Sequence, residues 1–192
     1  MTTIQSIYSN PPIFETERLL LRKIAATDLD DMFRYASDPE VTKYVLWDTH
    51  QTLEDTRQFL DYALEAYRNE EVSPWGIECK ENGKFIGTID FVSWSERHRT
   101  AEIGYTIGRP YWGKGYMTEA ARELLKFGFE HMDLLRIQAR CFPENIGSER
   151  VMQKLGMTYE GTLRQAMNLR GTQMDLKQYS ILREEFFSNE GH

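Results

Sequence analysis

The chain has 192 residues, of which 41% are hydrophobic, 28% charged and 12% aromatic, a composition typical of one globular domain with a packed core and not of a disordered tail or a fibre. Acidic residues outnumber basic ones by 30 to 23, giving a net charge of −7, which disfavours nucleic acid and anionic membranes as partners and favours a basic amine. Because the amino terminus lacks the pattern of a signal peptide and no run of about eighteen apolar residues occurs, we expect a cytoplasmic protein.

The first half of the chain predicts one strand followed by two helices. Residues 16–23 form an apolar segment whose short length suits one strand of a sheet. Residues 28–35 fit a short helix with an acidic first turn, which we expect to end before Pro39. Residues 52–69 predict a longer helix, since Thr52 and its third successor Asp55 form the pattern of a capping box.

Three strands are expected next, at residues 75–80, 84–94 and 100–109. The Asn82-Gly83 pair between the first two indicates a hairpin, because both residue types tolerate a positive φ angle.

The second half predicts a glycine turn and a helix at 118–131, a strand at 134–142, and a helix at 145–155 that Gly156 ends. Two closing strands follow around Gly171. Hairpins dominate and helical crossovers are confined to the stretch from Trp112 to Leu155, so the fold class is α/β (α+β) with a mostly antiparallel sheet.

The turn at Gly113-Lys114-Gly115 carries the strongest chemical signal. It connects a strand to a helix, and the free amides and positive dipole of a helix start form an anion site. The two glycines let the backbone approach phosphate without an intervening Cβ. The alternative is a purely structural turn that needs positive φ angles. The turn is not a dinucleotide-binding fingerprint, because Thr118 stands where a third glycine is needed, and it is not a Walker A loop.

Four segments of the chain resemble the GNAT superfamily of N-acetyltransferases, and more narrowly its RimJ/RimL subgroup. The strongest match is Ala-Glu-Ile-Gly-Tyr at 101–105, leading into Tyr-Trp-Gly-Lys-Gly-Tyr-Met-Thr-Glu-Ala at 111–120, which is similar to motif A of that superfamily. The other matching segments are residues 16–22, 86–89, and 145–148 followed by 151–157. The resemblance spans about 14–182 and implies one acetyltransferase domain, 1–192, with a GNAT-like sheet that is splayed at a cofactor cleft and flanked by helices.

The resemblance implies acetyl-coenzyme A as the cofactor. Its pyrophosphate would bind the turn, formed by Trp112, Gly113, Lys114, Gly115, Tyr116, Met117 and Thr118. Met117 replaces the usual small residue but leaves the backbone donors in place. The pantetheine arm would lie in a gap between strands 100–109 and 134–142, against the backbone of Ile103, Tyr105 and Ile107.

Acetyl transfer to an amine needs a base, an oxyanion donor and an acid for the departing thiolate. The resemblance places the oxyanion donor on the backbone near residues 103–105. Glu102 is the first candidate for the base, the alternative being a carboxylate that binds a neighbouring backbone or arginine. Asp175 is the second candidate, the alternative being a turn or strand-edge residue. Some RimL-like proteins carry a carboxylate where Met167 stands here.

Asn145 and Ser148 begin the helix at 145–155, where an asparagine cap and a second capping hydroxyl would be sufficient. The resemblance adds that Asn145 contacts the pantetheine or substrate region and that Ser148 protonates the coenzyme A sulfur. Cys141 precedes them at a strand end, where a small buried hydrophobe is the simpler interpretation. The spacing of Cys79, Cys141 and the four histidines indicates neither a disulfide framework nor a metal site.

The favoured function is an N-acetyltransferase acting on a primary amine, with the N-terminal amine of a ribosomal or other protein as one acceptor. The alternatives are a small-molecule amine acceptor and a non-catalytic coenzyme A-binding regulatory module. We expect the acceptor to contact residues 41–51, 67–73 and 163–173, which include Tyr44, Trp47, Tyr67 and Met167. The oligomeric state stays open, with a homodimer suggested by analogy to the family.

Overall fold

A computed structural model describes residues 4–190 of the chain. The helices are α1 (Ile4–Tyr8), η1 (Ala26–Asp28), α2 (Leu29–Ala36), α3 (Pro39–Thr42), α4 (Leu53–Arg68), η2 (Arg109–Tyr111), α5 (Tyr116–Glu130), α6 (Ile146–Lys154) and α7 (Arg183–Glu190). The strands are β1 (Phe14–Glu15), β2 (Leu19–Lys23), β3 (Trp75–Cys79), β4 (Lys84–Ser95), β5 (Thr100–Ile107), β6 (Arg136–Cys141), β7 (Thr158–Leu169) and β8 (Thr172–Leu182). None of the helices in this range is long and apolar enough to cross a membrane.

All eight strands join one sheet in the order β1-β2-β3-β4-β5-β6-β8-β7. Within the described residues β5 and β6 form a parallel pair, and the other neighbouring pairs are antiparallel. The predicted fold class, an α/β arrangement with a mostly antiparallel sheet, is therefore confirmed.

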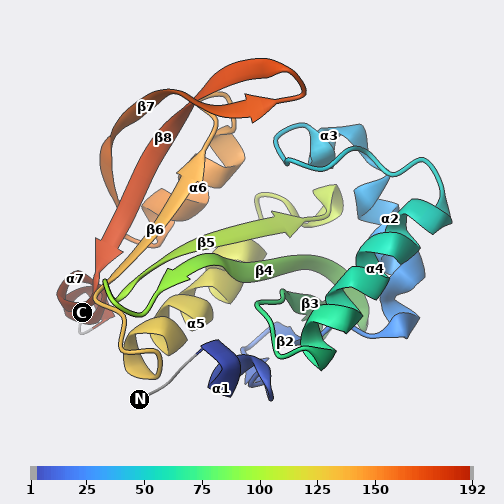
Figure 1. The fold of residues 1–192 in the computed structure, drawn as a ribbon, viewed down its shortest axis with the longest axis horizontal. Helices are drawn as coiled ribbons and strands as arrows, with labels where there is room; N and C mark the ends of the chain where they lie inside the picture. Colours follow the sequence, from blue (N-terminus) through green and yellow to red (C-terminus); the bar gives the residue numbers. More distant parts are fainter. Residues whose placement is uncertain (1–3, 191–192) are drawn as a thin grey trace.

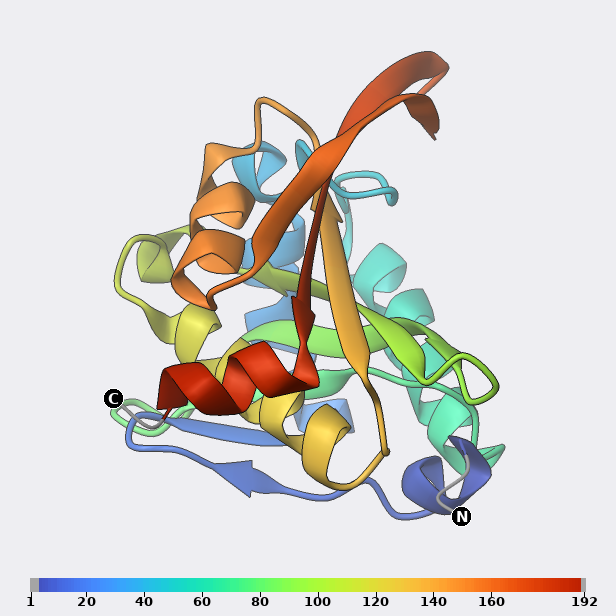
Figure 2. The same ribbon diagram turned by 90° about the vertical axis from the view of Figure 1, so that its left-hand side faces the viewer.

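The two faces of the sheet carry different helices (Figures 1 and 2). Helix α5 packs across one face, where Trp75, Phe91 and Phe129 are completely or almost completely buried in the larger core. Helices α2 and α4 cover the other face near β3 and β4 and form a second core with Met32 and Leu60. Because successive strand residues point to opposite faces, the sheet has an α5 face and an α4 face.

The strand pair β5–β6 separates after a short contact. The paired residues are Thr100 with Arg136, Ala101 with Ile137, and Glu102 with Gln138. From Ile103 onwards β5 keeps its pairing with β4 but has no paired residue in β6. This opening between two central strands is the gap that the resemblance implied, and residues 103–107 form one of its edges.

Local signals predicted several element boundaries correctly. Thr52 accepts a hydrogen bond from the Asp55 amide and completes the predicted capping box of α4. Gly156 and Gly171 have φ angles of +78° and +86°, as expected at a helix end and a hairpin turn. In the hairpin between β3 and β4, positive φ falls on Gly83 alone of the Asn82-Gly83 pair.

Other boundaries differ from the prediction for physical reasons. The strand predicted from residue 16 begins at Leu19, because residues 16–18 bend toward the start of α5. Helix α5 begins at Tyr116 and not at residue 118. Pro39 starts helix α3 instead of only ending the preceding helix, since Asp38 caps the Glu40 amide and proline fits the first helical turn.

Candidate functional site

The glycine turn before α5 presents a row of free backbone donors. Gly113 and Gly115 have φ angles of +71° and +83°, in the region that favours glycine. The Glu119 amide is the first to bond along the helix, to the Gly115 carbonyl at 3.0 Å. Within residues 4–190, the amides of residues 113–118 have no backbone acceptor in hydrogen-bonding distance. With the dipole of a 15-residue helix behind them, they fit an anionic phosphate.

Arg18 fixes this turn to the beginning of β2. Its Nε donates to Glu119 Oε2 at 2.6 Å, and its Nη1 donates to the Lys114 carbonyl at 2.9 Å. The guanidinium also lies 4.3 Å from the centroid of the Tyr116 ring. Thr16 adds a 2.6 Å hydrogen bond to the same Glu119 carboxylate. Residues 16–22 resemble a family motif in sequence, but their contact with Glu119 could not be predicted, because nothing local connects them to residue 119.

The alternation of backbone groups along β5 supplies donors to the gap. The Gly108 amide donates to the Ile86 carbonyl of β4 at 2.8 Å, and in an antiparallel ladder every second residue points the same way. The backbone groups of Ile103, Tyr105 and Ile107 therefore point away from β4 and toward the gap. Consistently, the Ile107 carbonyl accepts a 2.7 Å bond from the Trp112 indole on that side.

Asn145 and Ser148 lie at the start of α6, beside the gap. Asn145 Oδ1 accepts the Ser148 amide at 3.2 Å, so the asparagine is the helix cap. The Ser148 hydroxyl does not act as a second cap. It lies 3.0 Å from the Tyr105 hydroxyl of β5, and burial raises the pKa of that phenol well above its usual range. The hydrogen bond between the Tyr105 and Ser148 hydroxyls thus connects β5 to α6 next to the gap, and both groups carry an exchangeable proton.

Glu102 is bound by two neighbours on β6. Its Oε1 accepts from Arg140 Nε at 2.8 Å and its Oε2 from Gln138 Nε2 at 3.1 Å, and the residue is 8% exposed. The alternative interpretation, a carboxylate that binds an arginine, matches this geometry. The ion pair connects β5 and β6 where their pairing ends, and the catalytic role of Glu102 stays a prediction.

Asp175 and Cys141, the remaining residues that the sequence singled out, have contacts or burial that a structural role explains. Asp175 Oδ1 accepts the Gln165 amide at 2.8 Å, at a bulge in the β7–β8 hairpin where Gln165 has a φ of +50°. Cys141 is 4% exposed, and burial raises the pKa of its thiol to about 11. Cys141 is thus a small buried side chain, as the simpler interpretation of the sequence predicted.

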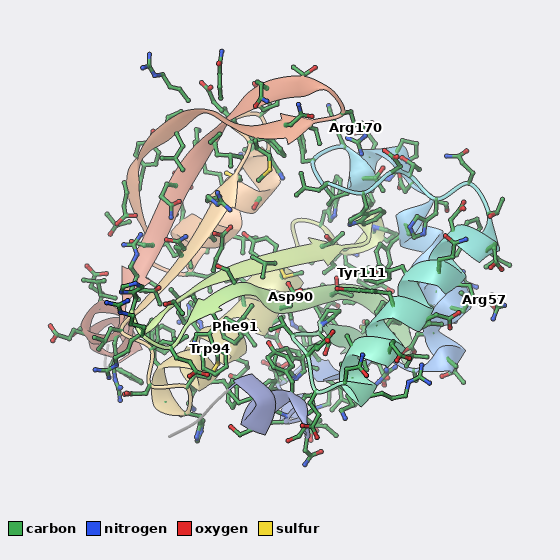
Figure 3. All side chains as sticks on the ribbon, in the orientation of Figure 1. Arg57, Asp90, Phe91, Trp94, Tyr111 and Arg170 are labelled. Carbon is green, nitrogen blue, oxygen red and sulfur yellow. The ribbon has the colours of Figure 1, made fainter. Side chains whose placement is uncertain are left out.

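Two of the three segments expected to contact the acceptor meet at Arg170, near the tip of the β7–β8 hairpin (Figure 3). Its Nη2 donates to the carbonyls of Thr42 and Trp47, each at 3.0 Å, and its Nε lies 3.3 Å from Asp48. The third segment, residues 67–73, was expected to contact the acceptor with Tyr67 among its residues. That side chain is buried instead, because its hydroxyl bonds to the Ile24 amide and the Pro74 carbonyl.

Asp90, in the middle of β4, was not singled out by the sequence analysis. Its side chain is partly buried, and desolvation raises the pKa of its carboxyl to about 7. Its position within an otherwise mostly apolar strand, between Ile89 and Phe91, is the signal that could have identified it.

Comparison with known proteins shows what the whole chain is similar to. A family model described as an acetyltransferase (GNAT) domain matches residues 18–158. The N-acetyltransferase YoaA of Bacillus subtilis is 36% identical over 172 residues, which cover 90% of this chain and 97% of that protein. The crystal structure of a GNAT-family acetyltransferase from Bacillus anthracis is 35% identical, with a TM-score of 0.80, and the match covers 91% of this chain and all of that one.

A more distant solved structure shows the same fold. It is RimL, a ribosomal L7/L12 alpha-N-protein acetyltransferase, in complex with coenzyme A joined to one of its cysteines by a disulfide. The identity is 20% and the TM-score 0.77, and the match covers 89% of this chain and 98% of RimL.

Proposed function

The chain belongs to the GNAT acetyltransferase family, and we propose that it transfers the acetyl group of acetyl-coenzyme A to a primary amine, as a member of the RimJ/RimL subgroup. Acetyl-coenzyme A is the acetyl donor that GNAT enzymes use. The observation that carries the proposal is the row of unpaired amides at residues 113–118, beside a gap whose edge is a strand with unpaired backbone groups.

The turn and the gap would bind different parts of coenzyme A. The amides from Gly113 to Thr118 would hold the pyrophosphate, and Arg18 keeps the turn in place through Glu119. Backbone groups of Ile103, Tyr105 and Ile107 would bond the pantetheine arm. The thioester supplies an acetyl group that an uncharged amine can attack.

The residues around the gap fit the charge changes of acyl transfer. The gap-facing amides of Ile103 and Tyr105 would stabilise a developing oxyanion. Ser148, hydrogen-bonded to Tyr105, would give its proton to the departing sulfur. Asn145 would hold Ser148 in place through the cap, and it acts as a positioning residue. Glu102 is the base predicted from the sequence, although both of its oxygens already accept hydrogen bonds.

The proposed acceptor is the N-terminal amine of a protein, with a small-molecule amine as the second candidate. The β7–β8 hairpin and residues 42–48 meet at Arg170 and provide a surface on which a peptide could lie. The name of RimL connects a protein of this fold with a ribosomal-protein amino terminus. The negative charge of the chain suits either basic acceptor. The proposed location is the cytoplasm, and the proposed assembly is a homodimer.

A thiol-release assay tests this function. The protein is incubated with acetyl-coenzyme A and, in parallel, with peptides that carry ribosomal-protein amino termini and with free amines. We expect thiol release only with an acceptor, and acetylation of its amine by mass spectrometry. Tight binding of acetyl-coenzyme A without acetylation of any amine would favour the non-catalytic regulatory module instead.

A further inference from the structure

Asp90 lies across from the one residue of β5 that leaves room for it. Asp90 pairs with Gly104 in the β4–β5 register, so the two residues share the α4 face of the sheet. A Cβ atom added to Gly104 would lie 3.3 Å from Asp90 Oδ1. The carboxylate therefore lies over the β5 backbone at a residue that has no side chain of its own.

A bulge in β4 shapes this position. The register shifts between Phe91 and Ser93, which leaves Val92 as the extra residue. A Cβ atom on Gly104 would come within 2.5 Å of Val92 Cγ1, so any larger residue would force Val92 or β5 to move. The bulge and the glycine together let the side chains of Val92 and Asp90 approach the backbone of β5.

The two residues that flank Gly104 are Ile103 and Tyr105, whose amides point into the gap. This is the stretch of β5 at which the proposed function stabilises the oxyanion. A group that takes a proton from the attacking amine has to lie close to the oxyanion donors, because nitrogen and oxygen are bonded to the same carbon in the transition state. Asp90, on the neighbouring strand, lies over the residue between these two donors. In Figure 3 it is labelled at the centre of the sheet, between α4 and the β7–β8 hairpin.

The chemical state of Asp90 differs from that of Glu102 on the same face. Glu102 is ion-paired with Arg140. Asp90 has no hydrogen bond or ion pair with another side chain in the part of the chain that the structure describes. The titratable groups that sense its charge are the phenols of Tyr8 on α1 and Tyr67 on α4. Desolvation without a compensating cation raises the pKa of Asp90 to about 7, a value at which a carboxylate accepts a proton effectively near neutral pH.

We propose that Asp90 is the general base of the acetyl transfer, which deepens the proposed function and rests on it. The Asp90 carboxylate takes one proton from the acceptor's ammonium group. The neutral nitrogen then forms a bond to the carbonyl carbon, and the carbon–sulfur bond breaks with the electron pair leaving on sulfur. Ser148 gives its proton to the sulfur, the nitrogen releases its second proton to water, and Ser148 regains a proton from water, so that the products are the amide and the coenzyme A thiol. Glu102, bound to Arg140, joins β5 to β6 where their pairing ends.

Three isosteric variants test the assignment: Asp90→Asn, Glu102→Gln and Asp61→Asn. Asp61 is exposed on α4 and serves as the matched control for loss of one carboxylate. Acetyl-coenzyme A affinity is measured by calorimetry, and kcat/KM for one peptide amine is measured from pH 5 to 9. The ratio of wild-type to variant kcat/KM removes the ionisation of the acceptor itself, since it is common to both enzymes.

For Asp90→Asn we expect this ratio to rise through about pH 7, where the Asp90 carboxyl ionises, and to reach roughly 100-fold at pH 8. The affinity for acetyl-coenzyme A should stay within two-fold of wild type, and Asp61→Asn should give a flat ratio near one. A flat ratio for Asp90→Asn would overturn the assignment, and a pH-dependent ratio for Glu102→Gln alone would give the role to Glu102.

Two further results show whether the base assignment fails alone or together with the proposed function. A wild-type protein that binds acetyl-coenzyme A but acetylates no amine overturns both. Should Asp90→Asn fail to fold, Asp90→Glu decides, because it keeps the carboxylate and moves it by one methylene. We expect that variant to bind acetyl-coenzyme A normally and to shift the pH at which kcat/KM rises; an unmoved profile with full kcat overturns the assignment.

Discussion

The guanidinium of Arg18 lies 2.6 Å from the carboxylate of Glu119, although 101 residues separate the two in the chain. The same arginine bonds the Lys114 carbonyl inside the glycine turn. The pair therefore fixes the start of α5 against β2, and with it the direction in which the free amides of the turn point.

Replacing Arg18 with methionine should weaken coenzyme A binding about ten-fold, which corresponds to about 1.4 kcal/mol, because the turn loses its anchor. The melting temperature should also fall. Arg57→Met is the matched control, since Arg57 forms an exposed helical ion pair with Glu54 at 3.6 Å and pairs of this kind contribute little. Calorimetry and thermal melting check both variants, and equal coenzyme A affinity in the two would contradict an anchoring role for Arg18.

Gly115→Val should reduce coenzyme A affinity by ten-fold or more. The φ of +83° is strained for any side chain, and a β-branched residue would also intrude where phosphate approaches. Gly171→Val controls for backbone strain, because Gly171 has a φ of +86° at the turn of the β7–β8 hairpin. We expect both variants to lose thermal stability and only Gly115→Val to lose affinity in a calorimetric titration. A loss of affinity in both would point to global destabilisation instead.

Ser148→Ala should lower kcat by about ten-fold or more, on the order of 1.4 kcal/mol in the barrier, if its hydroxyl protonates the sulfur. Stability should change little, because the cap of α6 is Asn145 and the Ser148 amide remains. Thr52→Ala, which removes the cap of α4, should instead cost about 1 kcal/mol of stability and leave kcat unchanged. Steady-state kinetics and thermal unfolding separate the two roles, and an unchanged kcat for Ser148→Ala would exclude the proton transfer.

Cys141 should be dispensable for acetyl transfer, so Cys141→Ala should keep most of the activity. Because burial raises the thiol pKa to about 11, little thiolate exists at pH 7. Exchange with oxidised coenzyme A should then be slow at pH 7 and accelerate about ten-fold per pH unit up to pH 9. Intact-mass spectrometry detects the adduct, with Cys79→Ala as the control. An inactive but folded Cys141→Ala that still binds acetyl-coenzyme A would require an acetyl-cysteine intermediate.

Asp90→Asn should make the protein more stable at pH 8 and change little at pH 4. The folded-state pKa of about 7 lies above the ordinary value of 3.8, so the folded state holds its proton more tightly than the unfolded state does. The wild type therefore loses stability as pH rises from about 4 to 7, by at most about 4 kcal/mol for the full shift. Asparagine does not ionise, and its advantage should grow over the same interval. Melting temperatures from pH 4 to 8 check this, and a constant difference would contradict the desolvated carboxyl.

Much of the fold could be predicted because its signals are local. The capping box at Thr52, the glycine that ends α6 and the hairpin turn at Gly171 depend on residues within one turn of each other. The signal for the predicted phosphate turn is equally local, since its two glycines directly precede the helix. The resemblance to the family's motifs further predicted the order of these elements and the acetyl donor, acetyl-coenzyme A.

Only the tertiary structure decided which polar side chains reach the gap and in what state. The sequence favoured Glu102 as base, but its ion pair with Arg140 depends on the three residue pairs that join β5 to β6. Asp90 looked like an ordinary strand residue until the register placed it opposite Gly104 and the bulge at Val92 turned the strand. Strand register, bulges and contacts such as Arg18 with Glu119 arise from packing between distant segments, and they set the burial and the partners on which the chemistry of a carboxylate depends.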